Sequence, residues 1–166
     1  MKFVLATHNP NKIREMGAIL SQFGVEVVSP RDLGITVDVE ETGVTFAENA
    51  MLKAKAICEL AKLPAIADDS GLCVDALNGA PGVYSARYGG EGLDDQGRYT
   101  LLLQNLRGQT TRAAHFTCAI ACAFPNGDTP LRDRPPAPSP LRLWGTTGSV
   151  MTLYSSCLTR QRPLHS

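Results

Sequence analysis

The sequence predicts an α/β fold with a mixed β-sheet, and three observations support this prediction. Short apolar runs with β-prone residues, such as residues 2–6 and 25–29, alternate with longer amphipathic segments. Helix-capping residues stand where the amphipathic segments begin. Residues 125–128, Pro-Asn-Gly-Asp, predict a hairpin turn. The expected order of elements is therefore β-α-β-α-β-β-α-β.

The first helix is predicted directly after the first strand, residues 2–6. Asn9 suits the N-cap, Pro10 suits the first helical position, and Gly24 is the expected stop. Apolar residues recur between them at helical spacing, at Ile13, Met16, Ile19 and Leu20. Residues 25–29 form the second strand, and a loop follows.

A longer helix is predicted to begin at Thr45. Thr45 and Glu48 match a capping box, and Pro64 ends the helix. Residues 64–71 and 72–77 are predicted to be two short strands around a carboxylate-bearing turn. A shorter amphipathic helix over 94–106 and a strand within 113–124, which enters the hairpin turn, complete the expected elements.

The composition is that of one soluble globular domain. Apolar residues make up 43% of the 166 and charged residues 19%. No apolar run approaches the ~18 residues of a membrane span, and the start is too weak for a secretion signal. The five cysteines form no paired CxxC spacing, which favours reduced thiols over disulfides or zinc. We therefore expect a cytoplasmic protein without a membrane partner.

The formal net charge of zero hides a break near residue 129. Residues 1–128 hold 11 basic and 15 acidic residues, whereas residues 129–166 hold five Arg and one Asp. The later segment also contains 6 of the 11 prolines. With only Trp144 and Tyr154 as aromatics, it gives little support for nucleic-acid binding. We predict a domain over 1–128 and a Pro/Arg-rich tail over 129–166.

The segment "THNPNK", residues 7–12, lies between a strand and a helix. A helix N-terminus presents unpaired N–H groups and the positive end of the helix dipole, which together bind phosphate. Thr7 and Asn9 add short polar side chains, and Lys12 adds a cation. The alternative is simple helix capping beside a solvated lysine.

Two further segments carry charge. Asp68 and Asp69 follow an apolar run, and such carboxylates can bind Mg²⁺ or accept a proton from water. The alternative is a turn that uses them for local hydrogen bonds. Glu40 and Glu41 lie in a loop, and the helix that follows carries lysines at positions 53 and 55, which can equally be surface charge. Together the segments supply what phosphate-ester hydrolysis needs.

The order and spacing of four segments make the chain similar to a known family. These segments are "LATHNPNKIREM", "EETGVTFAENAMLKAKA", "LPAIADDSGLCVDALNGAPGVYSARYGG" and "HFTCAIA". They resemble the pyrophosphatases of non-standard purine nucleoside triphosphates, the inosine/xanthosine triphosphatase family. The resemblance implies an elongated α/β fold, two lobes around a nucleotide cleft, and a homodimer. It also implies Mg²⁺-dependent cleavage of inosine, deoxyinosine and xanthosine triphosphates to monophosphate and pyrophosphate.

The resemblance also implies roles for individual residues. Glu40 and Asp69 would bind the metal, and Asp69 would be the general base. His8 stands where the family often has Gly, which leaves its role open. The positions that would bind substrate are Thr7, His8, Asn9, Pro10, Asn11, Lys12, Lys53 and Ser70.

The resemblance implies a Phe-Gly-Tyr/Trp-Asp-Pro segment that packs against the purine, and a later Ser-His-Arg segment that reads the base oxygen. Neither of these base-reading motifs occurs after residue 128. A shift back by one base with permitted codons converts Ser149–Ser156 into Phe-Gly-Tyr-Asp-Pro-Leu-Phe-Phe, which matches a family motif. We hypothesise that the tail is an out-of-frame translation that ends prematurely, with the slip between Asp128 and Trp144. A genuine Pro/Arg-rich extension is the alternative. Resequencing the coding DNA decides between them.

An altered C-terminal region has consequences for the fold and the activity. We expect an unpaired sheet edge, low stability and little base-selective turnover. A nucleotide pyrophosphatase of the Maf-like septum-inhibitor type is the second enzyme considered, although its Ser-Pro-Arg-Arg loop fits "THNPNK" less well. An inactive nucleotide-binding remnant is the third possibility.

Overall fold

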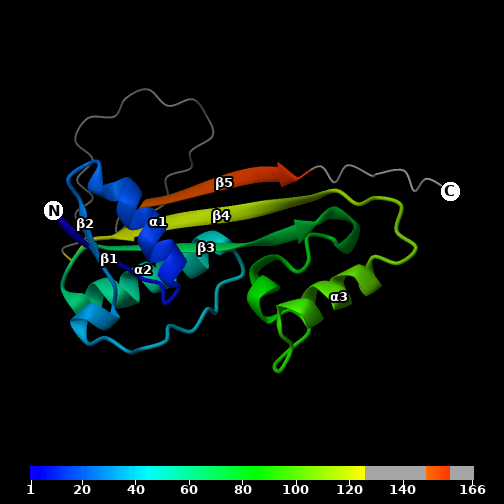
Figure 1. Ribbon diagram of the computed structural model, residues 1–166, viewed down its shortest axis with the longest axis horizontal. Coiled ribbons are helices and arrows are strands. Elements are labelled where there is room, and N and C mark those ends of the chain that lie inside the picture. The colour runs from blue at the N-terminus through cyan, green and yellow to red at the C-terminus, as the bar shows by residue number, and fades with distance from the viewer. Residues whose placement is uncertain (126–148, 158–166) are drawn as a thin grey trace. The chain divides into compact units, whose positions relative to one another are not determined.

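The protein, a computed structural model, is described over residues 1–125 and, for the backbone alone, over 149–157. Its strands form one five-stranded sheet in the order β2-β1-β3-β4-β5 (Figure 1). They are β1 (Lys2–Leu5), β2 (Glu26–Val28), β3 (Ala65–Val74), β4 (Ala114–Ala123) and β5 (Ser149–Cys157). Residues 126–128 of the predicted hairpin turn, the tail's prolines and the proposed site of the frame slip lie outside the described residues.

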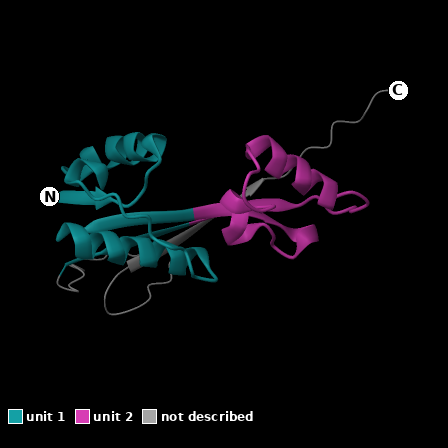
Figure 2. Cartoon of the chain, turned by 90° about the horizontal axis from the view of Figure 1, so that it is seen from below, with its two compact units in different colours: residues 1–69, 119–152 teal, residues 70–118, 153–166 magenta. Residues whose placement is uncertain are grey.

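The sheet is mixed, as predicted. Strand β1 is parallel to both β2 and β3. The chain divides into two compact units, one holding residues 1–69 and the end of β4, the other holding residues 70–118 (Figure 2). Strand β3 passes from the first unit into the second, and β4 passes back. These hydrogen-bonded neighbours therefore run in opposite directions, and the α/β fold class is confirmed. The nucleotide cleft between two lobes stays a prediction.

The helices begin where the sequence predicts them. Helix α1 (Pro10–Ser21) has Asn9 as its N-cap, and the Asn9 side chain accepts a hydrogen bond from the backbone N–H of Asn11. Helix α2 (Phe46–Ala61) has both hydrogen bonds of the Thr45–Glu48 capping box. Helix α3 (Asp95–Asn105) falls within the predicted range 94–106.

Both longer helices end slightly before the predicted stops. Helix α1 ends at Ser21, three residues before Gly24, whose φ is 71°. Helix α2 ends at Ala61, where Lys62 takes a left-handed conformation with φ 55° before Pro64. The cap geometry thus sets each end, and the glycine and proline lie just beyond it.

The two short strands predicted over 64–77 are one strand. Strand β3 runs without interruption through Asp68, Asp69 and Ser70, so the predicted turn is wrong. The physical reason is tertiary: β3 is hydrogen-bonded between β1 and β4, and both aspartates are buried. Pairing on both sides overrides the turn preference of the Asp-Asp-Ser-Gly sequence.

The sheet edge beside β4 is paired. Strand β5 adds a fifth strand there. The sequence of β5, SVMTLYSSC, contains the β-prone residues Val, Thr and Tyr. The last strand of the sheet on this side is therefore β5, and the expectation of an unpaired sheet edge stays a prediction.

The core beneath the sheet is built from small side chains on α2 and aliphatic side chains on β1. Ala50 and Ala54 of α2 are fully buried, as are Ala65 and Ala67 of β3. Such small residues let the helix backbone approach the sheet closely, which fixes α2 against the strands that carry the site. In the described residues no helix is long and apolar enough to cross a membrane.

Candidate functional site

The predicted site residues cluster where the strand order reverses. After β1 the chain passes through α1 to β2 on one side, and after β2 it passes through α2 to β3 on the other. In open α/β sheets, ligands bind beyond the carboxyl ends of the two strands at such a switch point. The register pairs Leu5 with Ile66, so Thr7, just past the end of β1, and Asp68, within β3, lie at the same level of the sheet.

The segment after β1 forms the first side of the site. Its backbone is fixed by a hydrogen bond from the N–H of Asn9 to Thr7 Oγ1 at 3.2 Å, and by one from the N–H of Asn11 to Asn9 Oδ1 at 2.9 Å. The side chains of His8, Asn9, Pro10 and Asn11 are exposed. The first turn of α1 is therefore open to a ligand from solvent.

Lys12 reaches from the first turn of α1 to β3. Its Nζ lies 2.5 Å from Oδ2 of Asp68, whose side chain is 7% exposed. Lys12 itself is about one third exposed. The structure thus brings Lys12 to Asp68 rather than to Asp69.

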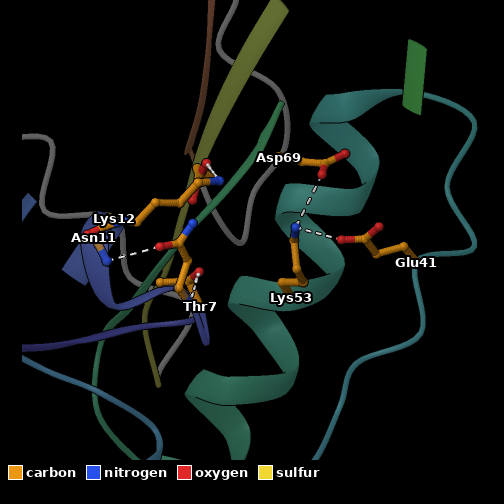
Figure 3. Close-up of polar contacts among 8 residues, drawn as sticks. Thr7, Asn11, Lys12, Glu41, Lys53 and Asp69 are labelled. Carbon is orange, nitrogen blue, oxygen red and sulfur yellow. Dashed lines mark hydrogen bonds and ion pairs between the residues drawn. The ribbon is translucent and has the colours of Figure 1, made fainter. Parts of the chain in front are cut away.

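Asp69 faces a second cluster, on the α2 side of β3. Lys53 Nζ lies 2.7 Å from Glu41 Oε1 and 3.3 Å from Asp69 Oδ1 (Figure 3). Adjacent residues of a strand point to opposite faces of the sheet. This alternation explains why Asp68 contacts a lysine of α1 while Asp69 contacts a lysine of α2.

Asn49 ties the loop that carries Glu41 to helix α2. Its side chain is fully buried, and its Oδ1 accepts a hydrogen bond from the N–H of Gly43 at 2.8 Å. A Cβ at Gly43 would lie 2.6 Å from that same oxygen, so only glycine fits the close approach. The buried contacts at Gly43, two residues after Glu41, therefore hold this part of the loop in place.

The site contains buried polar atoms without a hydrogen-bond partner in the described residues. They are Asp68 Oδ1, Asp69 Oδ2 and Asn49 Nδ2. Buried polar atoms are almost always paired, so orphaned carboxylate oxygens point to a ligand that supplies the missing partner. The Asn49 amide nitrogen, Nδ2, makes no hydrogen bond within the described residues, although it lies near enough to Asp69 to oppose the rise of that residue's pKa.

Burial sets the electrostatics of the α2 side. Burial, partly opposed by the positive charge of Lys53, raises the pKa of the Asp69 carboxyl above its ordinary value, and the negative charge of Glu41 adds to the rise. Burial alone would lower the pKa of Lys53, but the hydrogen bond from Lys53 to Glu41 and the charges of Asp69 and Glu41 raise it overall. Asp69, a carboxyl with a raised pKa, therefore lies beside Lys53, a lysine whose pKa is also raised.

The donor atoms fit a hard divalent cation. Asp69 and Glu41, which both contact Lys53, offer carboxylate oxygens, which are the ligands that Mg²⁺ prefers, and Mg²⁺ commonly takes one or two carboxylates and keeps several waters. Among the described residues no three His, Cys, Asp or Glu side chains form a ready cation site. A site completed by water and a substrate phosphate agrees with both observations.

Three residues that the sequence analysis discusses make none of these contacts. Glu40 is exposed, and its neighbour Glu41 makes the ion pair with Lys53. Ser70 is exposed on β3 directly after Asp69. Lys55 is exposed on α2, in agreement with its interpretation as surface charge.

The sequence analysis did not identify the roles of Glu41, Gly43 and Asn49. One signal was available for Asn49: it precedes Lys53 by four residues and therefore shares its face of α2. No comparable signal separates Glu41 from Glu40, because both lie in an irregular loop.

The fold and these contacts define an α/β protein with a charged, partly buried site at a topological switch point. A family model described as the Ham1 family matches residues 3–132. The chain belongs to the Ham1 family. This match and those that follow agree with the pyrophosphatase family that the sequence resembles, and not with the Maf-like type.

Curated proteins with similar sequences are named dITP/XTP pyrophosphatases. A dITP/XTP pyrophosphatase of Leptospira interrogans is 51% identical over 120 residues, which is 72% of this chain and 61% of that protein. One of Streptomyces coelicolor is 52% identical over 130 residues, 76% of this chain and 65% of that protein. The chain thus spans less than two thirds of the length of these curated relatives.

Solved structures agree with the fold. The Staphylococcus aureus Ham1 protein matches with a TM-score of 0.76 and 36% identity, covering 94% of this chain and 70% of that one. A HAM1 protein from Coxiella burnetii matches with a TM-score of 0.74 and 32% identity, covering 100% of this chain and 77% of that one.

Proposed function

We propose that the chain carries a nucleoside triphosphate pyrophosphatase site that acts on inosine, deoxyinosine and xanthosine triphosphates with Mg²⁺. The proposal is supported by family membership and by relatives named dITP/XTP pyrophosphatase. The observation that carries it is the paired arrangement at the switch point, where Lys12 meets Asp68 and Lys53 meets Asp69. Carboxylates and lysines gathered beside the end of β1 can bind a polyphosphate that carries a metal ion.

The segment from Thr7 to Lys12 would hold the polyphosphate. The first backbone N–H groups of α1 and the side chains of Thr7, Asn9 and Asn11 can donate hydrogen bonds to phosphate oxygens. Lys12 and Lys53 would supply positive charge. His8 and Pro10, both exposed in this segment, lie where the resemblance implies substrate contact, as does Ser70.

Asp69 would hold the Mg²⁺ together with a glutamate of the 40–41 loop. The resemblance implies Glu40 for this role, whereas the ion pair with Lys53 favours Glu41. Bound Mg²⁺ neutralises phosphate charge and so favours attack by water.

Asp69 would also accept the proton of the attacking water. Its raised pKa makes it a better proton acceptor than an ordinary aspartate. Water would attack the α-phosphorus. The bond from this phosphorus to the oxygen that bridges the α- and β-phosphates would break, and pyrophosphate would leave with the electron pair of that bond. The proton passes to the Asp69 carboxylate, and nucleoside monophosphate remains.

The test is magnesium-dependent release of pyrophosphate from inosine triphosphate, compared with Asp69→Asn. General-base catalysis predicts a loss of about 10²–10⁴-fold in kcat for the variant. Because the base-reading motifs that the resemblance implies do not occur in residues 129–166, we expect base selectivity to be weak. Binding without turnover would identify an inactive nucleotide-binding remnant, and equal turnover by Asp69→Asn would contradict the assigned role.

The quaternary and cellular settings are also proposals. We propose a homodimer in the cytoplasm, because the resemblance implies the dimer and the cysteine pattern favours a reducing compartment. Sedimentation of the purified chain checks the first of these.

A further inference from the structure

Lys53 occupies the space between two carboxylates that come from different parts of the chain. Its ammonium lies within 3.3 Å of both Glu41, in the loop before α2, and Asp69, on β3 (Figure 3). The Lys53 side chain is only 17% exposed. The remaining oxygen of Asp69, Oδ2, is buried without a hydrogen-bond partner among the described residues.

Two carboxylates at such close range need a cation. Their mutual repulsion in a partly buried setting is large compared with that in water, and Lys53, which contacts both carboxylates in the part of the chain that the structure describes, relieves it. The proposed function places Mg²⁺ at Asp69 and a glutamate of the 40–41 loop, for which the ion pair with Lys53 favours Glu41. An ammonium that lies between these two carboxylates therefore competes with a divalent cation for them.

We propose that Lys53 is an internal stand-in for the divalent cation. In the ligand-free chain Lys53 neutralises Glu41 and Asp69, and when the cation arrives with a polyphosphate, Lys53 exchanges these carboxylates for phosphate oxygens. The inference rests on the proposed function and adds to it the order in which charges change partners. The flexible four-carbon stem of lysine allows such an exchange without movement of helix α2.

The exchange couples the two ligands. A cation that binds alone must displace Lys53 and leave a mostly buried ammonium without its partners, which opposes binding. A polyphosphate supplies the new partner and removes this opposition. Each ligand therefore strengthens the binding of the other by the same factor.

The experiment is calorimetric titration of Mg²⁺ alone into wild type, Lys53→Met and Lys55→Met. Lys55 lies two residues along α2 and is exposed, so Lys55→Met removes the same charge without touching the cluster. We expect Lys53→Met to bind Mg²⁺ about 5–150-fold more tightly than wild type, the usual range of coupling between sites. Lys55→Met should bind as wild type does.

A second titration adds inorganic tripolyphosphate at a fixed concentration, with Mg²⁺–tripolyphosphate binding measured separately without protein. Tripolyphosphate should tighten Mg²⁺ binding in wild type and much less in Lys53→Met. Lys53→Gln is the second charge-removing variant, and Mg²⁺ should raise its melting temperature more than that of wild type.

The outcomes separate the two claims. Equal Mg²⁺ affinity in wild type and in both Lys53 variants overturns the stand-in role while leaving the proposed function intact. An equal gain in Lys55→Met also overturns it, because the gain would then be a general charge effect. No binding of Mg²⁺ to wild type even with tripolyphosphate overturns the proposed function, and the inference falls with it.

Discussion

Helices α1 and α2 contribute one lysine each to the site, but they are built in opposite ways. None of the residues of α1, all of which the structure describes, is buried, whereas α2 buries six: Phe46, Asn49, Ala50, Ala54, Ile57 and Cys58. The N-terminus of α1 is capped by one side-chain hydrogen bond. The N-terminus of α2 is closed by a full capping box.

The difference suits two different tasks. An open helix start such as that of α1 can receive the phosphates of a ligand that comes and goes. A buried helix such as α2 can hold the backbone of Lys53 in a fixed place beside Glu41 and Asp69, because the packing of its alanines against the sheet leaves little freedom. The site therefore joins an accessible half to a rigid half across strand β3.

Glycine substitutions on the two sides give the largest contrast in stability. Gly43 on the α2 side has no room for a Cβ, which would lie 2.7 Å from Cβ of Glu48 and 2.6 Å from Oδ1 of Asn49. We expect Gly43→Ala to lower the free energy of unfolding by about 1–3 kcal/mol. The measurement is urea unfolding followed by circular dichroism.

Gly17 on α1 is the matched control. A Cβ there meets no atom within 4 Å, and Gly17 lies inside the helix. Gly17→Ala should therefore raise the free energy of unfolding by about 0.5–1 kcal/mol through helix propensity. Effects of the same sign and size at both positions would remove the distinction between the rigid half and the open half.

The pH dependence of stability gives a smaller effect on the rigid half. Because the pKa of Asp69 is raised above its ordinary 3.8, the unfolded chain releases this proton first as pH rises. The carboxyl therefore lowers the free energy of unfolding progressively from about pH 3.8 up to the raised pKa, and the loss persists at pH 7.

Asp69→Asn removes this loss. Relative to wild type, the variant should gain stability between pH 3 and pH 7, as urea unfolding at about those two pH values would show. A variant that loses stability relative to wild type over that interval would mean that the ion pair with Lys53 outweighs burial.

Local signals in the sequence predicted much of the fold. Asn9 and Thr45 cap the helices that they were expected to cap, because capping depends on residues within a few positions. The course of β3 could not be predicted in the same way. Its Asp-Asp-Ser-Gly sequence favours a turn, and only pairing with the distant strands β1 and β4 keeps it extended.

The site was predicted in its parts but not in its pairings. The sequence indicated Lys12, Lys53 and Asp69 as charged residues of one site, and the structure gives each an ion pair. Which carboxylate meets which lysine depends on the faces of β3 and on the path of the loop before α2. Neither Asp68 as the partner of Lys12 nor Glu41 as the partner of Lys53 follows from sequence spacing.

The most direct test of the central claim is the affinity for inosine triphosphate, measured by calorimetry with and without Mg²⁺ in wild type and in Asp69→Asn. If the cluster at the switch point binds a metal-bound triphosphate, Mg²⁺ should tighten binding by about 5–150-fold in wild type and have little effect in the variant. An affinity that is the same with and without Mg²⁺ in wild type, or a magnesium effect that Asp69→Asn retains in full, would contradict the account.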